Sequence, residues 1–159
     1  MQPAVMSPAM SQSSMSGSSR RIFLLIALLA LAGVAVSSVS LYHHYGTSQT
    51  TYCDFGENFN CDIVNRSIYS TILGVPVALI GIVGYLGLVV LVTVYRNRAE
   101  TPARLALASL AGLGFALYLT YIEKFVLATW CVLCLSSLAL IFCISILSSL
   151  LWRYQAGRP

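Results

Sequence analysis

Four long runs of apolar residues alternate with shorter polar segments along the chain, at 22 to about 41, about 71–95, 103 to about 126, and 131–152. At about 1.5 Å rise per residue, a helix over each run is long enough to cross the hydrocarbon core of a bilayer. None of the runs carries a charge away from its ends. Because a lipid-exposed span must satisfy its own backbone hydrogen bonds, the pattern predicts an all-α integral membrane four-helix bundle.

The polar segments divide the remainder of the chain. Residues 1–19, MQPAVMSPAMSQSSMSGSS, show no apolar period and are predicted to be a disordered tail. The membrane domain is expected over 20–153, with an outer loop at 42–70 and a C-terminal tail at 154–159. A cleaved signal peptide is the alternative for the first run, which follows two arginines. Its membrane length favours a retained helix.

Composition agrees with this pattern, since 58% of the residues are apolar, 9% are charged and the mean hydropathy is +0.82. These values exclude an ordinary soluble domain. The net charge of +4 would suit a nucleic-acid partner, but the positions of the charges argue against one.

Most basic residues fall on one predicted side of the membrane. Seven of the nine lie in or beside the two tails and the second loop: Arg20, Arg21, Arg96, Arg98, Arg104, Arg153 and Arg158. Only Arg66 and Lys124 fall on the other side. The positive-inside rule therefore predicts cytoplasmic termini, with loops 42–70 and 126–130 facing the opposite compartment.

Five cysteines are the candidate chemical groups. Cys53 and Cys61 stand in the outer loop, in CDFGENFNC, with seven residues between them. Cys131 and Cys134 form CVLC at the start of the last apolar run, and Cys143 follows nine residues later, about 13 Å deeper on a helix. Four thiols therefore share one membrane face, on the side where disulfides persist.

Two thiol pairs at one face favour redox chemistry. The N-terminus of a helix stabilises thiolate over thiol, which makes a Cys-x-x-Cys pair reactive. A loop pair and a helix pair then form a relay by thiol–disulfide exchange. The deeper pair needs an acceptor in the membrane, and a lipid-soluble quinone fits. The Cys-x-x-Cys pair lies at the start of the helix, near the membrane surface, because one substrate of the relay is in water and the other is in lipid.

Other interpretations remain open on the residues alone. A four-cysteine zinc site is possible in principle, but the loop pair is too widely spaced for a usual zinc knuckle, so we expect no metal. A non-catalytic membrane scaffold stapled by disulfides is a further alternative. Cys143 is expected to be core packing, because a buried free cysteine behaves as a small hydrophobe.

The pattern resembles the vitamin K epoxide reductase family, in particular bacterial homologues that reoxidise a periplasmic thiol oxidase. CDFGENFNC, Ser67, GVPVALIG and CVLC carry the likeness, which covers about residues 20–152. The family implies a bundle around a quinone, with the loop over its outer mouth. It implies that Cys53 and Cys61 are the shuttle pair, that Cys131 exchanges with the loop, that Cys134 faces the quinone, and that Ser67 lies near the active site.

The chain departs from the family pattern in the quinone pocket. Vertebrate members bind the vitamin K oxygens with an Asn and a Tyr, where this chain has Val77 and Leu138. Reduction of a simple quinone is therefore favoured over epoxide reduction, and a quinone or epoxide reductase serving a quinone cycle is the alternative.

The resemblance also implies a partner and a location. Many bacterial homologues carry a fused thioredoxin-like domain, and this chain ends at Pro159 without one. We therefore expect a separate thioredoxin-fold thiol protein, DsbA-like, as electron donor and ubiquinone or menaquinone as acceptor. The expected location is a bacterial inner membrane, with the active site on the periplasmic side.

Overall fold

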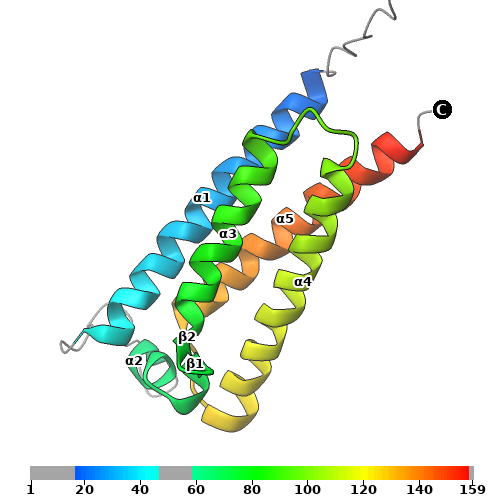
Figure 1. Cartoon of the computed structure of the whole chain (residues 1–159). Helices are drawn as coiled ribbons and strands as arrows, with labels where there is room; N and C mark the ends of the chain where they lie inside the picture. The colour runs from blue at the N-terminus through cyan, green and yellow to red at the C-terminus, as the bar shows by residue number, and fades with distance from the viewer. Residues whose placement is uncertain (1–16, 47–58, 158–159) are drawn as a thin grey trace, which may run out of the picture.

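The computed structural model describes residues 17–46 and 59–157 and shows an all-α bundle, as predicted. Its long helices are α1 (Gly17–Tyr45), α3 (Val77–Thr93), α4 (Thr101–Ile122) and α5 (Val132–Ala156). They run alternately up and down, so that the start of α1 and the end of α5 lie at one end of the bundle (Figure 1). Between them lie α2 (Cys61–Asn65), η1 (Ile68–Ser70), β1 (Thr71–Ile72), β2 (Val75–Pro76) and the π-helical turn η2 (Glu123–Leu127).

Three helical segments are long and apolar enough to cross a membrane: Gly17–Tyr45, Thr101–Leu127 and Val132–Ala156. The fourth apolar helix, α3, is shorter at 17 residues, which corresponds to about 26 Å. Large apolar side chains such as Leu28, Leu107 and Phe142 are exposed on the outside of the bundle. An apolar outer surface suits lipid, and the chain is an integral membrane protein.

The start of α3 differs from the sequence prediction. A helix was predicted from about residue 71, but Thr71–Pro76 forms a two-stranded antiparallel hairpin in which Ile72 pairs with Val75. Leu73 and Gly74 connect the strands with φ of 53° and 82°, as the tight turns of two-residue hairpins require. Pro76 then precedes the first helical residue, so α3 begins at Val77.

The first helix is longer than predicted at both ends, because it begins at Gly17 and continues to Tyr45. Residues 17–19, predicted to belong to a disordered tail, are helical. The rest of that tail, 1–16, lies outside the described residues, as do 47–58 of the predicted outer loop.

Four helices contribute to one hydrophobic core. Its buried side chains are Phe23, Ile26, Ala30, Tyr85, Leu88, Val92, Leu105, Ile141, Ile144 and Leu151. Helix α1 packs against α3 and α5, and α4 packs against α5. Helices α3 and α4 touch each other less closely, which leaves room between them for a cavity.

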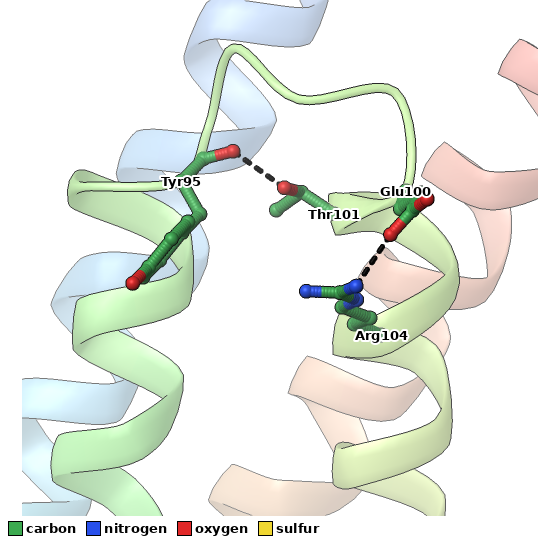
Figure 2. Close-up of polar contacts among 4 residues, drawn as sticks. All are labelled: Tyr95, Glu100, Thr101 and Arg104. Atoms are coloured by element: carbon green, nitrogen blue, oxygen red, sulfur yellow. Dashed lines mark hydrogen bonds and ion pairs between the residues drawn. The ribbon is translucent and has the colours of Figure 1, made fainter.

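The turn between α3 and α4 is held by its own polar groups (Figure 2). The Thr101 hydroxyl donates a hydrogen bond to the Tyr95 carbonyl, and Arg104 forms an ion pair with Glu100 one helical turn earlier. Pro102 occupies the first turn of α4, where its missing N–H costs no hydrogen bond. This turn lies at the end of the bundle opposite α2 (Figure 1).

Close packing of α1 on α3 generates a stability prediction. A Cβ atom added to Gly33 would lie 2.4 Å from the ring of Tyr85. We expect Gly33→Ala to lower the free energy of unfolding by about 1–3 kcal/mol, the usual cost of overpacking. Gly114→Ala in α4 is the matched control, because its added Cβ meets nothing within 4 Å. Thermal unfolding of both variants in detergent tests this, and equal midpoints would contradict it.

Candidate active site

Two segments far apart in the sequence are joined at the end of the bundle that carries α2. Phe59 forms a parallel bridge with Trp130. The Asn60 N–H donates a hydrogen bond to the Trp130 carbonyl at 3.1 Å. These contacts hold the residues before Cys61 beside the residues before Cys131.

Both of these cysteines stand at the start of a helix. Asn60 caps α2, because its Oδ1 accepts a hydrogen bond from the Ile63 N–H at 3.1 Å. Cys61 is the first residue of α2, and Cys131 is the N-cap residue of α5. The prediction that the Cys-x-x-Cys pair opens the last helix agrees with this geometry.

Cys61 and Cys131 pack together in a small buried cluster. Val64 is its third member, and Leu127, Leu133 and Cys134 pack against it. Cys61 is 1% exposed and Cys131 is 0% exposed. Cys61 is disulfide-bonded, whereas Cys131, Cys134 and Cys143 are free thiols. Cys53 lies outside the described residues.

The two thiols of the Cys-x-x-Cys pair are not equivalent. A hydrogen bond with the Cys134 side chain lowers the pKa of Cys131 below that of an ordinary thiol, although burial and the charge of Glu123 act in the opposite direction. A donor hydrogen bond to a thiolate stabilises its charged form. Cys131 is therefore the more readily ionised member of the pair, and Cys134 supplies the proton of the hydrogen bond.

Glu123 is a site residue that the sequence analysis did not select. It is 2% exposed, and its Oε2 accepts a hydrogen bond from the Cys131 N–H at 3.2 Å. The signal in the sequence was an acid near the end of a membrane-length apolar run, eight positions before Cys131. Acids in such positions are costly and therefore usually functional.

A cavity of about 730 Å³ lies beside the thiols, between the long helices and α2. Its wall includes Glu123, Cys134 and Ser137, together with many apolar side chains. Pockets for small organic ligands typically span about 300–1,000 Å³ and are mostly apolar. The cavity therefore suits an apolar ligand that bears a few polar atoms.

Asn65, at the end of α2, is, like Glu123, a buried polar residue on the cavity wall. Its Oδ1 accepts a hydrogen bond from the Ser40 hydroxyl at 2.8 Å, and its carbonyl lies 2.5 Å from Nδ1 of His44. Because a carbonyl only accepts, Nδ1 is the donor. The Nδ2 amide of Asn65 has no partner among the described residues. Asn65 is thus a residue of the cavity wall whose buried amide donor lacks a partner among the described residues.

The residues predicted from the family pattern lie as follows. Ser67 lines the cavity, and its hydroxyl donates a hydrogen bond to the Val64 carbonyl at 2.8 Å. Val77 also lines the cavity, whereas the half-buried Leu138 is not among its lining residues. Tyr85, which was not predicted, lines it and donates to the Ser137 carbonyl at 2.9 Å.

The expectation for Cys143 was wrong. It was predicted to pack in the core, but it is exposed on the outer face of α5. The neighbouring Ile144 takes the buried position. Within 17–46 and 59–157, no group of three or more His, Cys, Asp or Glu side chains is arranged to hold a metal ion.

The chain also matches a known protein family. The sequence pattern of the vitamin K epoxide reductase family matches residues 24–149 of this chain. The matched region contains α2, α3, α4, Cys53 and the Cys-x-x-Cys pair.

The position of Cys143 generates a prediction. Cysteines linked by a disulfide usually have Cα atoms less than about 7 Å apart, and Cys143 lies about 13 Å beyond Cys134 along the same helix. We expect Cys143→Ala to keep at least about half of the thiol-dependent turnover, because the residue faces away from the other thiols. Turnover and expression are measured in one membrane preparation. A folded but inactive variant would contradict the assignment of the site.

Proposed function

Because the chain belongs to the vitamin K epoxide reductase family, a family of membrane oxidoreductases that use a quinone, we propose that it is a thiol:quinone oxidoreductase. It takes electrons from a separate thioredoxin-fold thiol protein outside the cytoplasm. It passes them to ubiquinone or menaquinone, and so supports disulfide-bond formation. The observation that carries the proposal is the packing of Cys61 against Cys131, with Cys134 and the cavity directly behind them.

Electrons enter at the loop pair, Cys53 and Cys61. A partner thiolate attacks the disulfide of this pair and forms a mixed disulfide as the intermediate. Cys61 is the loop cysteine that lies against Cys131, and Cys131 has the lowered pKa that a reactive thiol needs. Exchange between these two residues oxidises the loop pair and leaves both thiols of Cys131 and Cys134 reduced.

The redox state of the described cysteines corresponds to one step of this relay. Cys61 is disulfide-bonded while Cys131 and Cys134 are free. In the proposed relay this state follows transfer from loop to helix. The next step from this state is reduction of the quinone, because both electrons are then on the Cys-x-x-Cys pair.

The quinone occupies the cavity beside Cys134. The cavity volume of about 730 Å³ suits the head group of a lipid-soluble quinone. We assign the unused Nδ2 donor of Asn65 to a quinone oxygen, because a ligand acceptor would satisfy this buried group. Val77 provides an apolar wall here, which agrees with reduction of a simple quinone.

The direction of the bundle in the membrane follows from charge. Arg20, Arg21 and Arg153 lie at the end that carries the start of α1 and the end of α5 (Figure 1). The turn that holds Arg96, Arg98 and Arg104 lies at the same end. By the positive-inside rule this end is cytoplasmic, and the thiol site faces the opposite compartment.

The function is tested by quinol formation with purified protein. Wild-type protein in lipid vesicles is mixed with a quinone and a reduced thioredoxin-fold thiol protein. We expect quinol to form in proportion to the thiol consumed, two thiols for each quinol. Absence of thiol-dependent quinol formation, in protein that unfolds cooperatively, would support the non-catalytic scaffold instead.

The order of the relay gives a separate prediction. Cys53→Ala or Cys61→Ala should abolish oxidation of the protein partner, because the entry pair is lost, while dithiothreitol still drives quinone reduction through Cys131 and Cys134. Cys134→Ala should stop both reactions, and Cys143→Ala is the matched control. The two reactions are followed by quinol absorbance in parallel. Equal loss of the dithiothreitol reaction in loop and helix variants would refute this order.

A further inference from the structure

We propose that Glu123 is the proton acceptor for the Cys134 thiol and passes that proton to the bound quinone. The proposal rests on the thiol:quinone function proposed above and adds a catalytic group to it. No cysteine performs this role, because the cysteines supply the electrons and must themselves lose protons.

Glu123 is buried, and no described residue supplies a cation that compensates its charge. It is 2% exposed and forms no ion pair with a described residue. The adjacent Lys124 is exposed, and its ammonium lies 5.2 Å from the ring centroid of Phe125 instead. A buried carboxyl that lacks a cation is costly to the fold. Such a group indicates a functional role rather than a structural one.

The two carboxyl oxygens of Glu123 have different surroundings. Oε2 accepts the hydrogen bond from the Cys131 N–H, at the positive end of the α5 dipole, which favours the ionised form. Oε1 has no well-formed hydrogen bond to any described residue. The Cys134 thiol interacts with the same carboxyl. The backbone therefore holds Oε2 in place, and Oε1 is left to interact with the Cys134 thiol and the ligand.

The local backbone directs the Glu123 side chain inward. Glu123 opens the π-helical turn η2, which ends at Ala128 in the left-handed region with φ of 49°. The Thr129 N–H donates back to the Glu123 carbonyl at 3.1 Å and closes the turn. Single π-helical turns inside helices occur frequently at functional sites. Here the turn places Glu123 and Cys134 on the wall of the same cavity.

The reaction balances with this assignment. The S–H bonds of Cys131 and Cys134 break, one S–S bond forms, and two electrons pass to the quinone. The Cys134 proton moves to the Glu123 carboxylate and then to one quinone oxygen. The Cys131 proton is released to water at the outer face, and the second quinone oxygen takes a proton from water. The products are one disulfide and one quinol.

The test uses Glu123→Gln, which keeps the shape of the side chain and an oxygen for the Cys131 N–H. Fully reduced protein in vesicles is mixed rapidly with quinone, and quinol formation in a single turnover is recorded. We expect the rate to fall by about 100-fold, the usual contribution of a general base. Transfer of electrons from the protein partner to the loop pair should remain within about twofold of wild type. Glu100→Gln, at the exposed turn of Figure 2, is the control and should keep the wild-type rate.

The pH profile separates a proton acceptor from a merely structural group. The titratable groups on the cavity wall are His44, Tyr69, Tyr85, Glu123 and Cys134. All except Glu123 are shared by wild type and variant. Because hydroxide can take the Cys134 proton in place of the missing carboxylate, the variant should regain rate by up to about tenfold per pH unit while the thiol stays protonated, whereas wild type should change less.

Each outcome decides the proposal. A slow Glu123→Gln variant that recovers at alkaline pH supports it, whereas a rate within twofold of wild type, or an equal loss at every pH, overturns it. If this variant does not fold, Glu123→Leu replaces it, since removing a buried charge is often tolerated, and the same two results apply. Failure of wild type to form quinol would instead refute the proposed function.

Discussion

The site depends on one short backbone contact, the pairing of Phe59 with Trp130 and the hydrogen bond from Asn60 to the Trp130 carbonyl. Helix α2 has five residues and is far too short to be stable by itself. Its position therefore comes from tertiary contacts, including the hydrogen bond between Ser40 and Asn65. Only with α2 held in this place does Cys61 pack against Cys131, although the two residues are distant in the sequence.

The membrane environment explains where the unsatisfied polar groups occur. Helices α1, α3, α4 and α5 present large apolar side chains outward, and their own backbone hydrogen bonds are satisfied within each helix. Asn65 Nδ2 and Glu123 Oε1, which have no hydrogen-bond partner in the part of the chain that the structure describes, belong to residues on the wall of a single cavity. A bound ligand with acceptor and protonatable oxygens would form hydrogen bonds with both, which supports the proposal that a quinone occupies this space.

The length of the apolar runs was sufficient to predict the helices, because a membrane span has a minimum length whatever its residues. Periodicity was less informative at residues 71–76, TILGVP, since an apolar stretch serves a hairpin as well as a helix. The cysteine spacing predicted the Cys-x-x-Cys helix start. The cysteine spacing did not predict Glu123 as a site residue. The inward direction of the Glu123 side chain depends on the π-helical turn and on the hydrogen bond between Asn60 and Trp130.

Glu123 links the stability of the site to its proposed chemistry. By accepting the Cys131 N–H, the carboxylate satisfies a backbone group at the start of α5 and gains from the helix dipole. That interaction offsets part of the cost of burying the negative charge that the proposed proton acceptor needs. The hydrogen bond with Cys134 lowers the pKa of Cys131 and outweighs the opposing effect of the Glu123 charge. In the proposed relay, this balance suits Cys131 to exchange with the loop, and Cys134 is the thiol whose proton needs a base.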